Sequence, residues 1–85
     1  MENESIIRSL IEKPLAEINI KLDDVSYLKE DNMNILRITI DKDPYVDVDD
    51  CVAATRIINP IIDGENIIDD AYVLDVCSKE RGGDN

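Results

Sequence analysis

The sequence contains no histidine, tryptophan or phenylalanine, and the absence of histidine removes several classes of function together. Without it, Ser–His and Cys–His catalytic triads and the HExxH metalloprotease site cannot be built. Cysteine is scarce as well, because Cys51 and Cys77 lack CxxC spacing and are too few for the usual zinc sites. We therefore predict reduced thiols in an intracellular protein, with no zinc site and no histidine-dependent catalytic centre.

Long hydrophobic runs are also missing. No run of apolar residues approaches the roughly 18 that a membrane span requires. The opening stretch, MENESII, lacks the basic start and the apolar length of a signal peptide. The chain of 85 residues is 44% hydrophobic with three tyrosines as its aromatic residues, so its core must be built from Ile, Leu and Val. We expect one small, folded, cytoplasmic domain.

Basic residues are few, with nine Lys and Arg against 20 Asp and Glu, which gives a formal net charge of −11. The segment 41–75 is the most acidic part, since Lys42 and Arg56 are its only bases. Binding to a phosphate backbone relies on clustered Lys and Arg, and the chain has no such cluster. A basic protein is therefore the better candidate partner. The alternative is that the acids only keep the domain soluble.

The first element expected is an amphipathic helix that ends before Asn19. Its apolar positions recur every three or four residues. They are Ile7, Leu10, Ile11, Pro14, Leu15 and Ile18. Asn3 or Ser5 is expected to cap the helix, Pro14 to kink it, and Asn19 to form the left-handed turn after it.

A β-hairpin is expected next, with arms over 21–29 and 34–41 and a turn in the Asp- and Asn-rich stretch between them. Residues of the second arm alternate between two faces of the sheet. Leu36, Ile38 and Ile40 are predicted to point into the core, and Arg37, Thr39 and Asp41 to point into solvent.

The stretch YVDVDDC, residues 45–51, is interpreted as the start of a second helix. Asp47 and Asp50 have the D-x-x-D spacing of a capping box. In a capping box, the side chain of each residue accepts a hydrogen bond from the backbone N–H of the other residue. Val46 and Cys51 then occupy the two ends of a hydrophobic staple. Asp49 and Asp50 lie in the first turn, where the helix dipole favours anions.

Two other interpretations of these acids are weaker. An EF-hand calcium loop needs glycine at its sixth and glutamate at its twelfth position, but a loop from Asp41 has Val46 and Val52 there. A loop from Asp47 has Val52 and Ile58. General acid catalysis needs a carboxyl with a raised pKa, whereas a helix N-terminus favours the charged form.

The second helix is expected to continue until Pro60 ends it early, with Gly64 at positive φ in the loop that follows. Its predicted apolar stripe comprises Val48, Cys51, Val52, Thr55, Ile58 and Ile62, which makes Cys51 a buried small hydrophobe. The last element is a well-covered strand over 71–77. The element order predicts a two-layer α+β domain (α-β-β-α-β) with both helices on one face of a three-stranded sheet. The pattern leaves open whether the third strand lies beside the first or the second.

Taken in order, these segments resemble the N-terminal domain of the ribosome maturation factor RimP family, also known as YhbC-like proteins. The resemblance rests on the segment 14–17 before the hairpin, LRITID at 36–41, VDVDDC at 46–51, ATRII at 54–58, Asp63, and YVLDV at 72–76. It implies a non-enzymatic factor, without a cofactor, that binds the small (30S) ribosomal subunit and assists its maturation. Family members usually continue from the last strand as Ser-Ser-Pro-Gly into an SH3-like barrel, whereas this sequence has Cys77, Ser78, Lys79 and Glu80. We therefore expect a RimP-like domain at 1–77, a polar tail or linker at 78–85, and no SH3-like barrel.

The acidity then suggests a basic ribosomal protein as the contact on the subunit, with 16S rRNA nearby. The residues expected at the partner interface are Arg37, Asp41, Asp43, Asp49, Asp50 and Arg56. The alternative function is a KH-like RNA-binding module that uses Arg37 and Arg56. The sequence lacks the GxxG loop with which KH domains clamp a nucleic-acid backbone.

Overall fold

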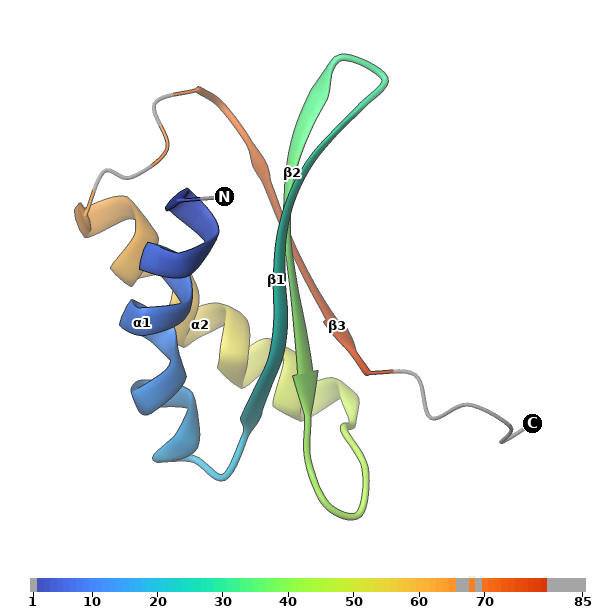
Figure 1. Cartoon of the computed structure of the whole chain (residues 1–85). Coiled ribbons are helices and arrows are strands. Elements are labelled where there is room, and N and C mark those ends of the chain that lie inside the picture. Colours follow the sequence, from blue (N-terminus) through green and yellow to red (C-terminus); the bar gives the residue numbers. More distant parts are fainter. Residues whose placement is uncertain (1, 66–67, 69, 80–85) are drawn as a thin grey trace.

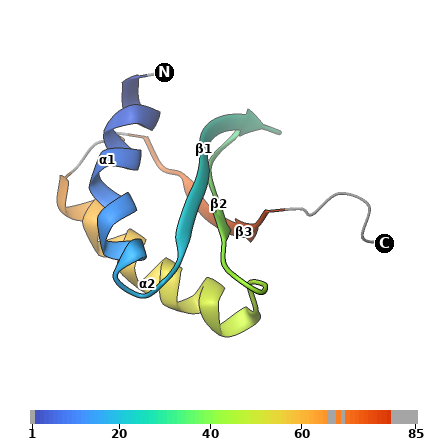
Figure 2. The same ribbon diagram turned by 60° about the horizontal axis from the view of Figure 1, so that its bottom comes forward.

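A computed structural model describes residues 2–65, 68 and 70–79 of the chain. The elements in order are α1 (Glu2–Ala16), β1 (Lys21–Glu30), β2 (Met33–Asp41), α2 (Val48–Glu65) and β3 (Val73–Ser78). Figures 1 and 2 show both helices packed together on the same side of the sheet. The predicted α+β architecture and its element order are therefore confirmed.

The sheet has the strand order β1-β2-β3, which answers the question that the sequence left open. β1 pairs antiparallel with β2, and β3 pairs parallel with β2, so the sheet is mixed. Because β2 is the central strand, its inward side chains are the best covered in the sheet. Leu36, Ile38 and Ile40 are fully buried, as their alternation predicted.

The core lies between the sheet and the two helices. Its fully or almost fully buried side chains are Ile7, Ile11, Leu15, Ile20, Leu22, Val25, Leu36, Ile38, Ile40, Ala54, Ile58 and Ile62. These residues are all aliphatic, in agreement with a composition that offers few aromatic side chains. The three tyrosines lie at or outside the margin of this core, where Tyr27 and Tyr72 pack against it.

The end of α1 matches the sequence prediction and its start does not. Asn19 has a φ of 64°, its N–H donates to the Ala16 carbonyl at 3.0 Å, and the Ile20 N–H donates to the Leu15 carbonyl at 3.0 Å. This pair of bonds is the Schellman motif, which ends helices. The predicted caps Asn3 and Ser5 are wrong, because the helix already begins at Glu2.

The hairpin turn consists of two residues, Asp31 and Asn32, with φ values of 52° and 64°. Both are left-handed, as in the tight turns that match the natural twist of paired strands. Glu30 and Met33 form the last pair before the turn, so the strands are paired to their ends.

The expectations for α2 need two corrections. First, the helix continues through Pro60 to Glu65 and includes Gly64, for which a positive φ was expected. Pro60 cannot bond the carbonyl four residues earlier, but that carbonyl belongs to the exposed Arg56, where water can satisfy it. Buried Ile58 and Ile62 on either side of Pro60 hold the helix on the core.

Second, the predicted apolar stripe of α2 is partly wrong. Val48 and Val52 are 77% and 43% exposed, and Cys51 is half-buried. The buried stripe instead consists of Ala54, Ile58 and Ile62. With Ala54, Ile58 and Ile62 facing the core, Val48 and Val52 lie on another side of the helix.

β3 was expected to be well covered, but it is an edge strand. None of its residues is fully buried, and Val73 is 45% exposed. The strand extends through Ser78, and the Lys79 N–H donates to the Ile40 carbonyl at 2.7 Å. The polar tail expected from residue 78 therefore begins with two residues that still join the sheet, and residues 80–85 lie outside the described part of the chain.

Candidate functional site

The connection between β2 and α2 contains the acids that sequence analysis singled out. The Asp47 N–H donates to Asp50 Oδ2 at 3.0 Å, and the Asp50 N–H donates to Asp47 Oδ1 at 2.9 Å. These reciprocal bonds confirm the predicted capping box. Val46 and Cys51 both pack against the core, as the two ends of a hydrophobic staple should. The start of α2 is thus fixed at a defined position relative to the sheet.

Lys42 ties the same helix start to the end of β2. Its Nζ donates to Asp50 Oδ1 at 2.9 Å, and the Asp50 side chain is 14% exposed. This bond, together with the one from the Asp47 N–H, holds the pKa of Asp50 below its usual value, and the same bond raises the pKa of Lys42. The Lys42 N–H also donates to Asp41 Oδ1 at 2.9 Å. Asp41 and Asp50 therefore stabilise the local backbone.

Two other acids of the connection have no such role. Asp43 and Asp49 are exposed, and the side chain of neither bonds another residue within the described part of the chain. Tyr45, between them in sequence, is 65% exposed. We call residues 41–50 the acidic loop. It brings together Asp41, Asp43, Asp49 and Asp50 of the predicted interface, and it presents Asp43 and Asp49 to solvent.

Arg37 and Arg56, the two predicted interface cations, lie on different sides of the sheet. Arg37 alternates with the buried Leu36 and Ile38, so it projects from the sheet face opposite the helices. Its Nε donates to Asp75 Oδ2 at 3.0 Å, and this hydrogen bond raises the pKa of Arg37. Arg56 is exposed on α2. The two guanidinium groups therefore do not form one basic surface.

Sequence reasoning missed an apolar groove on the exposed side of α2. Its lining residues are Val48, Cys51, Val52, Thr55 and Arg56, and we call it the α2 groove. The signal was present, because Val48, Val52 and Arg56 are spaced four residues apart and form a stripe of their own. Val48 and Val52 were assigned to the core stripe and Arg56 to the surface, although α2 has more apolar residues than one helix face can bury.

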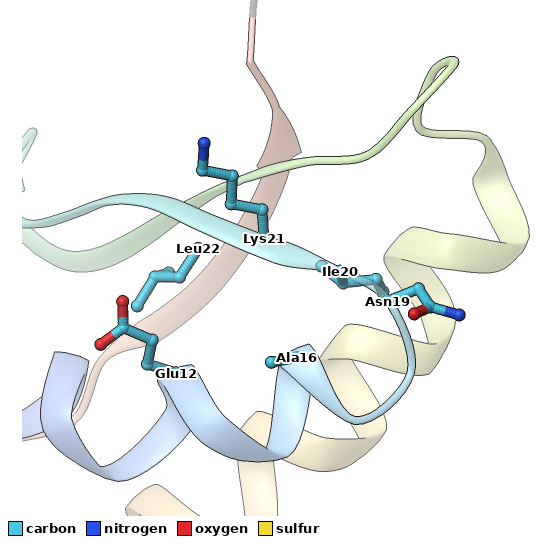
Figure 3. A pocket seen from close by; sticks show the side chains of 6 residues that line it. All are labelled: Glu12, Ala16, Asn19, Ile20, Lys21 and Leu22. Atoms are coloured by element: carbon cyan, nitrogen blue, oxygen red, sulfur yellow. The ribbon is translucent and has the colours of Figure 1, made fainter.

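Another groove lies between the end of α1 and the start of β1 (Figure 3). It is lined by Glu12, Ala16, Asn19, Ile20, Lys21 and Leu22. In Figure 3 the Lys21 side chain points away from α1, whereas the Glu12 carboxylate lies beside Leu22. Its lining has no pair of a nucleophile and a base, and none of the predicted interface residues contributes to it.

The described residues offer no group of three His, Cys, Asp or Glu side chains that could hold a metal ion. In the acidic loop the reason is visible, because Asp47 and Asp50 direct oxygens at each other's backbone N–H groups. Among the helices of the described chain, neither has the length and apolarity needed to cross a membrane.

Comparison with known families gives a match to the model of the RimP N-terminal domain over residues 10–79. The matched range begins in α1, includes the acidic loop and the α2 groove, and ends one residue after β3. It therefore covers most of the chain and every residue of the candidate interface.

Proposed function

Because the chain belongs to the RimP N-terminal domain family, we propose that it binds the small ribosomal subunit through the acidic loop, with a basic ribosomal protein as its direct contact. The family consists of non-enzymatic maturation factors that act on the 30S subunit. The proposal adds the surface and the chemistry of the partner. Residues 1–77 are proposed to form the binding unit.

The observation that supports this surface is the exposure of Asp43 and Asp49 on a loop that is otherwise held in place. The capping box and the Lys42–Asp50 ion pair fix the backbone on both sides of these two acids. A partner that meets them has little loop entropy to remove, so more of the contact energy appears as affinity. The net charge of −11 also steers the domain toward basic surfaces.

Binding to 16S rRNA through Arg37 and Arg56 has less support. Arg37 already donates to Asp75, and Arg56 lies on the other side of the sheet. An RNA backbone that reached Arg37 would have to displace this carboxylate and would meet its charge.

The test is cosedimentation with isolated small subunits and with assembled ribosomes over a salt series. We expect the double variant Asp43→Asn/Asp49→Asn to bind small subunits about tenfold more weakly than the unmodified domain, because two exposed charges are removed from the contact. The matched control is Glu12→Gln/Glu17→Gln, which removes one exposed acid from α1 and one from the turn directly after it, and changes the net charge equally. The control should bind within about twofold of the unmodified domain.

Equal weakening of both double variants would mean that net charge, and not the acidic loop, governs binding. Equal binding to small subunits and assembled ribosomes would also contradict the proposal. Anisotropy titration with a structured 16S rRNA fragment tests the alternative: saturable binding that Arg37→Gln removes would favour direct RNA contact.

A further inference from the structure

The two outer edges of the sheet differ in how far other parts of the chain cover their backbone groups. At the β1 edge, the Tyr27 N–H donates to Glu4 Oε2 at 2.8 Å, and Arg8 Nη2 donates to the Asp23 carbonyl at 2.9 Å. Glu4 and Arg8 both belong to α1, so this helix satisfies backbone groups that another strand would need. The bond from Tyr27 also lowers the pKa of Glu4, which keeps the carboxylate charged as an acceptor. The β1 edge is therefore partly covered by α1, which opposes the addition of a further strand there.

The β3 edge has no equivalent cover within the described residues. The Lys79 N–H donates to the Ile40 carbonyl, and the parallel register pairs Asp75 with Arg37 and Cys77 with Thr39. In a parallel pair, alternate residues bond the neighbouring strand, so the odd-numbered residues of β3 point their backbone groups at β2. The N–H and C=O groups of Leu74, Val76 and Ser78 therefore point outward, and no described residue bonds them. Such an edge is a template for strand addition.

The α2 groove lies on the helix that covers this strand. α2 packs against β3, and in Figures 1 and 2 the helix and the strand run along the same diagonal. Burial raises the pKa of Cys51 in the groove, and nearby charges that include Cys77 of β3 add to the shift. An extended segment placed on the β3 edge would turn every second side chain toward the helix side of the sheet. Val48 and Val52 are exposed there and available for apolar contact.

Charge indicates which molecule could bind at the β3 edge, a second copy of the chain or a basic segment of another protein. Asp49 and Asp63 are exposed on α2, and Asp70 is exposed just before β3. A second copy of the chain would bring a net charge of −11 to this edge, so repulsion opposes a continuous sheet between two copies. In a segment that alternates aliphatic and basic residues, the aliphatic side chains would face the α2 groove and the basic side chains would face the other side of the sheet, and the net charge of −11 favours the basic residues over acidic ones.

We propose that the outer edge of β3 and the α2 groove together receive an extended, lysine- or arginine-rich segment of a partner protein, which adds to the sheet as a fourth strand. The inference rests on the proposed function only in taking the partner to be a basic protein. It assigns a second contact surface, which adjoins the acidic loop at Val48 and Asp49, and a mode of binding through the main chain.

The direct test is anisotropy titration of the domain with a labelled synthetic peptide of about ten residues that alternates valine and lysine. Saturable binding is expected, and a matched peptide with glutamate in place of lysine should bind at least about tenfold more weakly. Two further peptides are N-methylated at all valines or at all lysines. Because alternate N–H groups of a strand face opposite edges, only one of these two peptides should lose binding.

Two variants test the surface on the protein side. Val52→Asp places a charge in the α2 groove, and its matched control is Ile6→Asp on α1, where the replaced side chain is 45% exposed against 43% for Val52. Ser78→Pro removes an outward N–H of the edge, at a position where proline is tolerated. We expect Val52→Asp and Ser78→Pro to weaken peptide binding at least about fivefold and Ile6→Asp to leave it unchanged. A proton–nitrogen correlation spectrum of each variant verifies the fold.

Binding that survives both N-methylated peptides would show side-chain attraction without strand addition and would overturn the inference. A dimer in sedimentation velocity that Ser78→Pro dissociates would assign the edge to a second copy and overturn it as well. Small-subunit binding separates the two proposals. Loss of that binding in Asp43→Asn/Asp49→Asn, with full retention in Val52→Asp and Ser78→Pro, would leave the acidic loop as the only contact.

Discussion

The roles of individual residues could be predicted from the sequence where the residues that interact lie within a few positions of each other. The capping box of Asp47 and Asp50 and the left-handed Asn19 are of this kind, and the structure contains both. The exposure of Val48 and Val52 was predicted wrongly, because their spacing fits a core stripe as well as the surface stripe that they form with Arg56. Only the position of the sheet under α2 decides which of two possible stripes is buried.

At the residue scale, Asp50 gives a prediction about pH. Its folded-state pKa is lowered first by the bond from Lys42 and then by the Asp47 N–H. A lowered folded pKa means that the stabilisation is complete above the ordinary pKa and is lost as pH falls through the folded value. We expect the free energy of unfolding, measured with urea between about pH 5.5 and about pH 3, to fall less steeply in Asp50→Asn than in the unmodified domain.

The control for this pH series is Asp49→Asn. Asp49 lies in the same first turn of α2, but its side chain bonds no other described residue, so its replacement removes neither the bond to Lys42 nor the capping bonds and should leave the pH dependence parallel to that of the unmodified domain. Parallel curves for Asp50→Asn as well would show that the Lys42–Asp50 pair contributes nothing specific to acid stability.

The type and order of the helices and strands were predicted well. Their lengths and how deeply they are buried were predicted less well. The helix and hairpin periodicities are strong, whereas the end of α2 depended on Pro60 and Gly64, two residues that stop isolated helices. Packing of Ile58 and Ile62 on the core overrides that local preference. The edge position of β3 lay beyond the sequence pattern, because a half-covered apolar strand and a central one have similar composition.

The prediction at the scale of the element concerns Gly64. It lies within α2, and a Cβ added there would meet nothing within 4 Å. Because glycine loses more backbone freedom than alanine when it joins a helix, we expect Gly64→Ala to stabilise the domain by about 0.5 to 1 kcal/mol in urea unfolding. Destabilisation would instead mean that residue 64 takes the positive φ that the sequence suggested, and that α2 ends near Pro60.

At the scale of the whole molecule, charge acts on folding and on binding in opposite directions. The net charge of −11 makes the folded domain repel itself, since ion pairs such as Lys42–Asp50, Arg37–Asp75 and Lys79–Asp23 offset only a few of its acids. The same excess of negative charge attracts the proposed basic partners. Salt screens both effects, so a single series of ionic strengths distinguishes them.

We expect the unfolding midpoint of the domain alone to rise by about 4 °C between about 20 mM and about 300 mM sodium chloride, which corresponds to about 1 kcal/mol of relieved repulsion. A variant with Asp43→Asn, Asp49→Asn, Glu12→Gln and Glu17→Gln should respond less, because it begins with fewer acids. Differential scanning calorimetry measures both midpoints. A midpoint that falls with salt would mean that the three ion pairs outweigh the repulsion of the unpaired acids. Small-subunit binding over the same series should weaken as salt rises, because the attraction that drives it is screened while the fold becomes more stable.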